Sequence, residues 1–550
     1  MGELPHEFPA RRGFSISYMG KTLLSRIDPI AQGEKLVSML PLEEGTLYFC
    51  PSPLYGYGLS ILFNSLKENS VILCVETDEK LYEISKKAFL TITESKTLQL
   101  IKAIEPAELC AFVNKTWGKR VFRRVETVRL GRGWQLYTQH YEDMEKALRR
   151  EIAVEWSNAM TLIRLGRLYS RNLIRNLIML PKSRDASALN FSSAPVLVLG
   201  AGPSLDSTLD ELGAHYGGKI PEQKKRRFKI ICVDSCFSAL IERGIHPDLV
   251  VILESQHYNL KAFIGFKNFK VDAVFDLSAL PISTRIFSGD RYIFATPWTE
   301  LRLIERLIDS GLLPETFPPL GSVGLSSVAI ALHLGQGPVI CGGLDFSYSI
   351  DAYYARCTPG HREFLMRQNR LKGIINAEAA FRTGSFSALS KNGKQVRSDP
   401  ALRNYWELFG QQFGGNTRLL DINSSGLSIG VKTVSAAEAF AILNDDTIYG
   451  TTGSTTGAVT GGAKIKEFIL KEIDTIDRLR DILSGAVHCE AARLEEFLDN
   501  ADYLWAHFPE CAGAGGRRPP ITDLSFLKRV RTEIEPFRKL WEMSLNSLND

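Results

Sequence analysis

Residues 196–206 constrain the fold of this chain more than any other segment, and they read VLVLGAGPSLD. A run of four apolar residues ends in two glycines, a proline and a serine, which is typical of a buried strand that turns directly into a helix. A close approach of two backbone segments leaves no room for a Cβ, and Gly200 and Gly202 have none. Pro203 suits a first helical turn. The amides that start such a helix, near Ser204, are unpaired donors, so the turn predicts a bound phosphate or nucleotide. Simple turn chemistry is the alternative.

Further short apolar runs follow this turn, with helical stretches between most of them. The strand candidates are Val196–Leu199, Ile230–Asp234, Leu249–Leu253, Ala273–Leu277, Tyr292–Ala295, Val339–Cys341 and Leu419–Ile422. This alternation predicts a mostly parallel sheet with helices on both faces. We therefore predict an α/β protein with a Rossmann-like central domain over residues 191–448.

A smaller version of the same pattern lies in residues 1–135. Apolar runs at 47–50 and 71–75 flank a glycine-containing turn at 53–58, and Glu76 follows the second run. This order outlines a small Rossmann-like domain with an acid at its second strand end. The domain either binds a nucleotide or methyl donor or serves as a scaffold. The incomplete glycine pattern favours the scaffold.

The remaining segments are predicted to be helical or flexible. Residues 136–190 carry apolar side chains at three- and four-residue steps and predict a helical connector. The Gly-, Thr- and Ser-rich stretch 449–463 predicts a flexible linker. Residues 464–550 predict a helical C-terminal domain, suited to docking or homo-oligomerisation.

The composition does not indicate a particular class of binding partner. The 550 residues exceed a single core, and 66 basic against 62 acidic residues give a net charge of +4, so neither nucleic acid nor an anionic membrane surface is predicted. The nine cysteines lack zinc-site spacing and predict reduced thiols in a cytoplasmic protein. The N-terminus has no signal-peptide profile, and no apolar stretch is long enough to predict a membrane span.

Polar residues gather after the predicted strands. Ligands of doubly wound sheets bind outside the carboxyl ends of the strands. The candidate ligands there are Gly200, Gly202, Pro203, Ser204, Asp234, Ser235, Gly343, Asp345 and Tyr348, with Gly321 and Ser322 before an Ala-rich helix. Tyr353 and His361 follow the last of these strands. Structural alternatives stand beside them, because Asp234 and Ser322 can cap helices, and a lone histidine is often structural.

In this order, the motifs resemble a known family. They are Gly200-Ala-Gly-Pro-Ser-Leu, Asp234-Ser, Gly244-Ile-His-Pro-Asp, Gly343-Leu-Asp-Phe-Ser-Tyr and Leu402-Arg-Asn-Tyr. Together they are similar to the central domain of the motility accessory factors, flagellin glycosyltransferases whose domain is described as 6-hydroxymethylpterin diphosphokinase MptE-like. The segment Gly20-Lys-Thr-Leu-Leu-Ser-Arg-Ile-Asp-Pro resembles the start of the same proteins. The resemblance covers most of residues 14–445.

A more distant resemblance links the same segments to bacterial CMP-sialic-acid-dependent sialyltransferases. In those enzymes a Gly-x-Gly-Pro-Ser-Leu turn opens the nucleotide site, tyrosines beyond the Gly-x-Asp-Phe strand end hold the phosphate, and a later histidine is the base. Tyr348, Tyr353, Tyr354 and His361 are the nearest counterparts in this sequence, although the spacing around His361 differs.

These resemblances imply transfer of a nonulosonic acid, of the pseudaminic or sialic type, from a CMP donor to Ser or Thr of flagellin. Backbone amides at Gly202–Ser204 and at the Gly321-Ser322 turn, with the phenol of Tyr348 or Tyr353, would stabilise the leaving phosphate, and His361 would accept the proton. His361 and Tyr353 are thus the candidate catalytic residues. No cofactor and no metal are expected.

Two other functions stay open. One is an ATP- and Mg²⁺-dependent pterin pyrophosphokinase, for which the candidate carboxylates are Asp206, Asp234, Glu254 and Asp345. The other is a non-catalytic protein that binds flagellin.

Overall fold

The computed structural model describes residues 4–89, 96–102, 105–118, 120–218, 220–297, 301–371, 373, 383–444, 461–512 and 517–549. The chain divides into two compact units. Unit 1 comprises residues 1–167 and 505–526, and unit 2 comprises residues 168–504 and 527–550. Each unit is described by itself.

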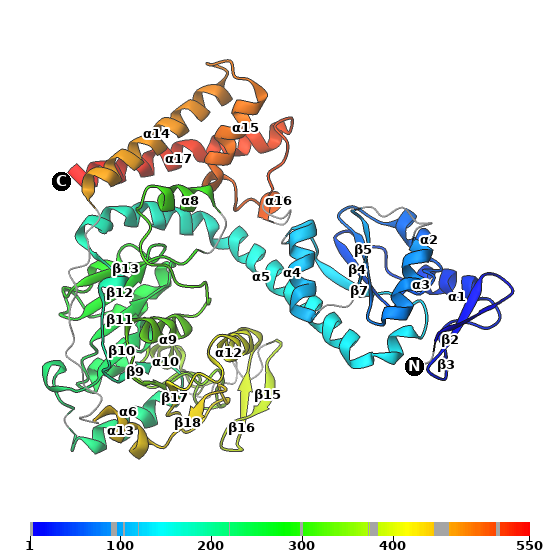
Figure 1. The fold of residues 1–550 in the computed structure, drawn as a ribbon. Coiled ribbons are helices and arrows are strands. Elements are labelled where there is room, and N and C mark those ends of the chain that lie inside the picture. Colours follow the sequence, from blue (N-terminus) through cyan, green and yellow to red (C-terminus); the bar gives the residue numbers. More distant parts are fainter. Residues whose placement is uncertain are drawn as a thin grey trace. The chain divides into compact units, whose positions relative to one another are not determined.

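Unit 2 is built around a nine-stranded sheet in the order β18-β17-β14-β9-β10-β11-β12-β13-β8, with every pair parallel (Figure 1). The strands are β8 (Arg184–Asp185), β9 (Val196–Leu199), β10 (Lys229–Val233), β11 (Leu249–Ile252), β12 (Asp272–Asp276), β13 (Arg291–Phe294), β14 (Val339–Gly342), β17 (Leu419–Asp421) and β18 (Lys432–Thr433). The predicted α/β fold with a mostly parallel central sheet is confirmed. All seven predicted strands are present, within one residue at each end.

Three features of unit 2 were not predicted. The edge strands β8 and β18 have two residues each, too few for a periodic signal. The antiparallel hairpin of β15 (Phe386–Leu389) and β16 (Gln395–Ser398) lies between β14 and β17 in the chain. Its strands are partly exposed and lack an apolar run.

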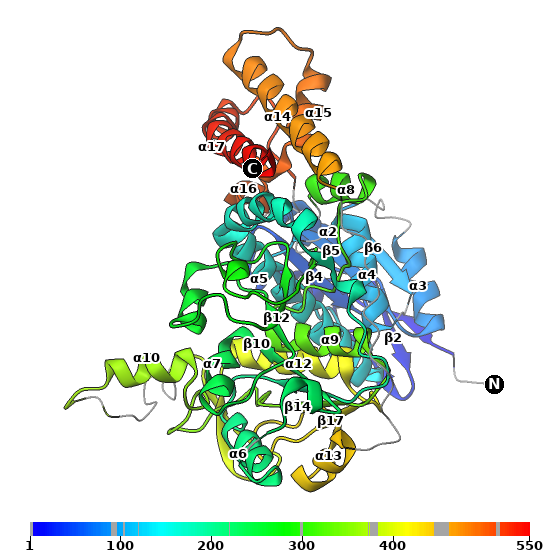
Figure 2. The same cartoon turned by 90° about the vertical axis from the view of Figure 1, so that its left-hand side faces the viewer.

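Alternate residues of the central strands face opposite layers of helices. Val196 and Val198 pack in one core with Leu325 and Val328 of α9, while Leu197 and Leu199 point to the other face. Helices α6 and α13 lie side by side, and α10 extends away from the sheet (Figure 2). The helices around the sheet are α6 (Leu205–His215), α7 (Asp234–Glu242), α8 (Arg302–Asp309), α9 (Val323–Leu334), α10 (Pro359–Arg367), α12 (Pro400–Phe413) and α13 (Ala436–Leu443).

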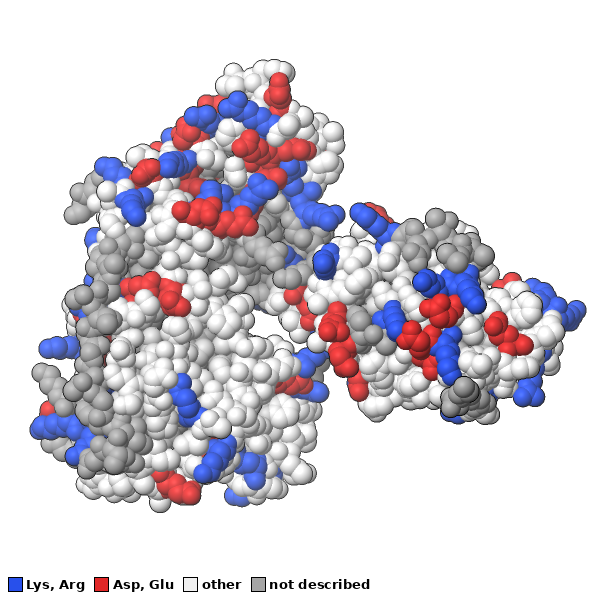
Figure 3. Space-filling view, in the orientation of Figure 1, with Lys and Arg blue, Asp and Glu red and all other residues white. Residues whose placement is uncertain are grey.

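Long helices end the chain, as predicted. They are α14 (Gly462–Ser484), α15 (Ala491–Asn500), α16 (Pro509–Ala512) and α17 (Leu524–Asn549). A bidentate ion pair from Arg306 of α8 to Glu472 of α14, with N–O distances of 2.7 and 2.9 Å, holds α14 in unit 2. Lys and Arg alternate with Asp and Glu over these helices (Figure 3). Most of the predicted linker 449–463 lies outside the described residues.

Unit 1 contains a four-stranded parallel sheet in the order β6-β5-β4-β7. Its strands are β4 (Thr46–Pro51), β5 (Val71–Glu76), β6 (Leu98–Lys102) and β7 (Arg124–Thr127), and an antiparallel sheet holds β1 (His6–Pro9), β2 (Phe14–Tyr18) and β3 (Lys21–Thr22). Its helices are α1 (Pro29–Ser38), α2 (Leu59–Ser65), α3 (Glu79–Phe89), α4 (Pro106–Trp117) and the first part of α5 (Thr138–Asn176). The smaller Rossmann-like pattern is thus present.

The acid at the end of β5 is fully buried. Glu76 accepts hydrogen bonds from the Ser52 hydroxyl (2.6 Å), the Tyr141 hydroxyl (3.0 Å) and the Asp78 amide (3.2 Å). The protein's own donors therefore occupy the acid that the pattern placed at the second strand end. This arrangement agrees with the scaffold interpretation.

Among the described residues, no helix is both long and apolar enough to cross a membrane. The cytoplasmic location and the five domain boundaries given above stay predictions.

Candidate functional site

The glycine turn lies where the strand order reverses. The chain runs from β9 outward to β13 and then returns to β14 on the other side of β9. Just beyond these two strands, the Gly200 amide donates to the Gly342 carbonyl (2.8 Å), and the Gly202 amide donates to the Gly343 carbonyl (2.9 Å). A Cβ on Gly200 would lie 2.5 Å from the Gly343 oxygen. The glycines therefore allow two backbones to cross, as the need for a close approach predicted.

The anion at the start of α6 belongs to the protein itself. The Ser204 amide and hydroxyl donate to Asp345 Oδ2 at 3.0 and 2.9 Å. Burial raises the pKa of Asp345 to about 7, against the opposing effect of the Ser204 hydrogen bonds. Ser204 is the N-cap of α6, so Pro203 precedes the helix and does not lie in its first turn as predicted. The nucleotide-binding roles of these residues and of Gly200 and Gly202 stay predictions.

The loop between β14 and α10 is fastened to this turn. The Ala355 amide donates to the Ala201 carbonyl at 3.1 Å, and the Arg356 amide donates to Asp206 Oδ2 at 3.0 Å. The Ser238 hydroxyl on α7 donates to the Cys357 carbonyl at 2.7 Å. Three elements thus fix the segment that leads into α10.

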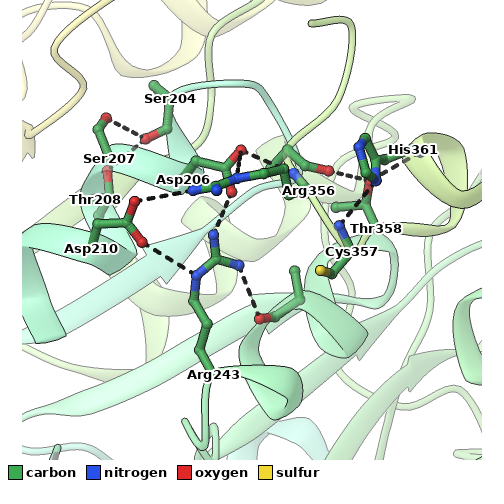
Figure 4. Close-up of polar contacts among 12 residues, drawn as sticks. Ser204, Asp206, Ser207, Thr208, Asp210, Arg243, Arg356, Cys357, Thr358 and His361 are labelled. Atoms are coloured by element: carbon green, nitrogen blue, oxygen red, sulfur yellow. Dashed lines mark hydrogen bonds and ion pairs between the residues drawn. The ribbon is translucent and has the colours of Figure 1, made fainter. Parts of the chain in front are cut away.

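Four charged side chains strengthen this attachment (Figure 4). Arg243, at the end of α7, contacts Asp206 at 2.6 Å and Asp210 at 3.5 Å. Arg356 contacts the same two carboxylates at 3.4 and 3.1 Å. Asp206 and Asp210 are one turn apart on α6, so both arginines bridge the same helix face.

The predicted tyrosines and histidine lie around this loop. Tyr348 is buried, and its ring centroid lies 4.4 Å from that of Tyr353. The Tyr353 hydroxyl donates to Asp399 Oδ2 at 3.1 Å. His361 Nδ1 accepts the Cys357 amide at 3.3 Å (Figure 4). The structure gives each of these groups a protein partner, and their catalytic and binding roles stay predictions.

A pocket of about 310 Å³ opens beside α10, between the start of α7 and the 3-10 helix His257–Phe263. Ser235 is the predicted site residue that lines it. The other lining residues are Tyr258, Asn259, Lys261, Ala262, Tyr354, Thr358, Pro359, Gly360, Glu363, Phe364 and Arg367. Hydroxyl, amide, aromatic and cationic groups therefore converge in one concavity, as in sites for polar small molecules.

Two carboxylates stand at neighbouring strand ends behind this pocket. Asp234 follows β10 and is buried, and Glu254 follows β11 and is partly exposed. Burial raises the pKa of Asp234 to about 7, and the negative charge of Glu254 adds to the rise. The Tyr258 hydroxyl donates to Glu254 Oε2 at 2.6 Å. Burial also raises the pKa of Tyr169 to about 12, with Glu254 as the next cause.

The start of α9 lies at the same sheet edge. Gly321 has a φ of +66°, and Ser322 is the N-cap without a side-chain capping bond. A Cβ on Gly321 would lie 3.4 Å from the ring of Tyr405. The negative charges of Glu254 and Asp399 add to the burial that raises the pKa of Tyr405. Gly321 and Ser322 thus stay candidate ligands.

Sequence reasoning missed Tyr258, Asn259 and Tyr405 as site residues. Tyr258 and Asn259 follow Glu254 by four and five residues, so the rule of strand ends was a usable signal for them. Tyr405 comes from a helix far along the chain, and it ends the Leu402-Arg-Asn-Tyr motif of the family resemblance, which did not assign it to the site. In the described part of the chain, no three or more His, Cys, Asp or Glu side chains are grouped so that they could hold a metal ion.

Part of the chain matches a known family model, and nearly the whole chain is similar to another protein. Residues 171–351 match the family model described as 6-hydroxymethylpterin diphosphokinase MptE-like, which confirms that predicted resemblance for this segment. A protein of Treponema pallidum (strain Nichols), described as uncharacterized, is 27% identical over 576 residues, which cover 99% of this chain and 96% of that protein.

The fold is also similar to a solved structure. It is the MAf glycosyltransferase from Magnetospirillum magneticum AMB-1, with a TM-score of 0.51 and 13% sequence identity. The match covers 100% of this chain and 90% of that one. At this identity the likeness shows a shared fold.

Proposed function

We propose that this protein is a glycosyltransferase that moves a nonulosonic acid, of the pseudaminic or sialic type, from a CMP donor to Ser or Thr of flagellin. The observation that carries the proposal is the polar pocket at the carboxyl ends of the parallel strands. Ser235 and residues of α10 are among those that line it. The fold similarity to a glycosyltransferase and the MptE-like match over residues 171–351 support it.

The site must stabilise the leaving phosphate and accept a proton. The anomeric carbon gains positive charge as CMP leaves, so the phosphate needs donors. Two cations, Lys261 and Arg367, line the pocket, and both pair there with Glu363. The acceptor hydroxyl loses its proton to a base, for which the sequence suggested His361. We propose that the reaction needs no resident cofactor and no metal, so that chelation leaves the rate unchanged.

Co-expression with a flagellin and a CMP-nonulosonate supply tests the proposal. We expect intact mass spectrometry to show flagellin heavier by whole nonulosonate residues, and CMP but not ATP to raise the Tm of the purified protein. Unmodified flagellin despite donor supply refutes the transferase.

A pterin pyrophosphokinase is the second candidate, because the description of the matched family model names such an activity. Its test is AMP formation from ATP with Mg²⁺ and a hydroxymethylpterin. A binding protein without catalysis would instead retain flagellin on a column and leave its mass unchanged.

A further inference from the structure

A carboxylate beside this pocket, Glu254, is a different candidate proton acceptor from the one that the sequence suggested. It does not line the pocket itself but accepts a hydrogen bond from Tyr258, which does. Gly360, Glu363, Phe364 and Arg367 line the pocket, at three- and four-residue spacing on one face of α10. His361 follows Gly360 by one residue, which turns it about 100° away from that face. Its Nδ1 also accepts the Cys357 amide.

The acid on α10 that does line the pocket is already paired. Glu363 lies 2.9 Å from Lys261 and also pairs with Arg367. The hydrogen bond from Lys261 is the largest cause that lowers the pKa of Glu363. A carboxylate bound to two cations is a poor proton acceptor.

Glu254 is differently placed. Tyr258, whose ring lines the pocket, donates its hydroxyl to Glu254 Oε2 at 2.6 Å, and the Gln256 amide donates to Oε1 at 2.9 Å. Both oxygens are thus oriented by neutral donors, and each keeps a lone pair. No cation is paired with Glu254 among the described residues.

A second polar side chain of the pocket contacts the neighbouring acid. Asn259 lines the pocket and is 94% buried, and its side chain hydrogen-bonds to Asp234. The 3-10 helix that carries Tyr258 and Asn259 thus contacts both carboxylates, Glu254 and Asp234.

We propose that Glu254, held by Tyr258, is the general base that accepts the proton of the acceptor hydroxyl. This inference rests on the proposed transferase. The acceptor oxygen forms its bond to the anomeric carbon, and its proton passes to a Glu254 oxygen. The bond from the anomeric carbon to the phosphate oxygen breaks, and its electron pair leaves with CMP.

Four titratable groups lie around Glu254. Asp234 on α7 is buried, and Tyr258, Tyr169 and Tyr405 face Glu254 from the 3-10 helix, α5 and α12. All three phenols are neutral near pH 7, and burial raises the pKa of each further above its ordinary value. They therefore act as neutral neighbours of the carboxylate.

The test compares Glu254→Gln, Tyr258→Phe and His361→Asn in the full chain, with the exposed Glu211→Gln as the matched control. We expect Glu254→Gln to lower kcat for transfer about 10²- to 10⁴-fold. CMP affinity, measured as the Tm shift at graded CMP, stays within about twofold. We expect Tyr258→Phe to lower kcat less than Glu254→Gln does, and Glu211→Gln to keep most of it, while His361→Asn tests the base that the sequence suggested.

The two readouts together separate a base from a structural residue, because loss of a base lowers kcat and leaves CMP affinity unchanged. An active Glu254→Gln protein, or a loss confined to His361→Asn, overturns the inference while the transferase stands. A wild-type protein that transfers no sugar overturns both proposals. A Glu254→Gln protein that has lost its CMP response shows a binding role and also refutes the base.

Discussion

Replacement of Glu76 by Gln tests whether the buried carboxyl of Glu76 makes the stability of unit 1 depend on pH. Burial raises the pKa of Glu76 to about 7, although hydrogen bonds from Ser52, Asp78 and Tyr141 oppose the rise. In the unfolded chain the pKa has its ordinary value of 4.5. At pH values between these two pKa values, Glu76 keeps its proton in the folded protein and has lost it in the unfolded chain. Stability is therefore full below about pH 4 and falls as pH rises toward 7.

The size of the effect follows from the two pKa values. A difference of about 2.5 units at 1.36 kcal/mol each corresponds to about 3 kcal/mol of unfolding free energy lost above pH 7. Glutamine has the same shape and no charge, so Glu76→Gln removes this loss. We expect the variant to match or trail the wild type at pH 5 and to exceed it by up to about 3 kcal/mol at pH 8.5.

Calorimetric melting of the full chain from pH 5 to 8.5, with hydrogen exchange of β5 amides at both ends of the range, measures this difference. Glu83→Gln, on the exposed face of α3, is the matched control and should leave the pH dependence unchanged. If the melting temperatures of Glu76→Gln and the wild type run parallel across the range, the burial argument is wrong.

Two predictions concern the glycine turn and the loop beside it. Gly202→Ala places a Cβ 2.1 Å from Asp345 Oδ2, so we expect a loss of about 2 kcal/mol in chemical denaturation. Gly213→Ala in α6, where a Cβ meets nothing within 4 Å, should instead gain about 0.5–1 kcal/mol, and equal effects would contradict the crossing argument. Asp206→Ala removes the acceptor of a backbone amide and two arginines, so we expect exchange of amides 355–358 to quicken at least tenfold. Asp210→Ala should change it less, and an unchanged loop in Asp206→Ala would show that the carboxylate does not hold it.

The sequence allowed the sheet to be predicted because its signal is local. Each central strand is a short run of buried apolar residues, and most of these runs are followed by a glycine or an acid. Such runs can be recognised without knowledge of their neighbours. The two-residue edge strands β8 and β18 form because a longer strand offers them a partner, which no local pattern reveals.

The site was less predictable, for a physical reason. The absence of side chains at Gly200 and Gly202 indicated a close approach, but a glycine does not reveal what approaches it. The approaching group is the backbone at Gly343, and the anion at Ser204 is Asp345, about 140 residues later in the chain. The pocket-lining Tyr258 and Asn259 lie on a short 3-10 helix whose pattern resembles an ordinary loop.

The division of the chain bears on the order of events during synthesis. Unit 1 is completed by residues 505–526, and Gly166 lies against His507, whose Cβ is 3.1 Å from a Cβ built at that glycine. The ribosome has made nearly the whole polypeptide before this last piece of the first unit emerges. Unit 1 therefore lacks this segment until nearly the end of synthesis, and residues 527–550, which belong to unit 2, emerge later still, so neither unit is complete before the last part of the chain is made.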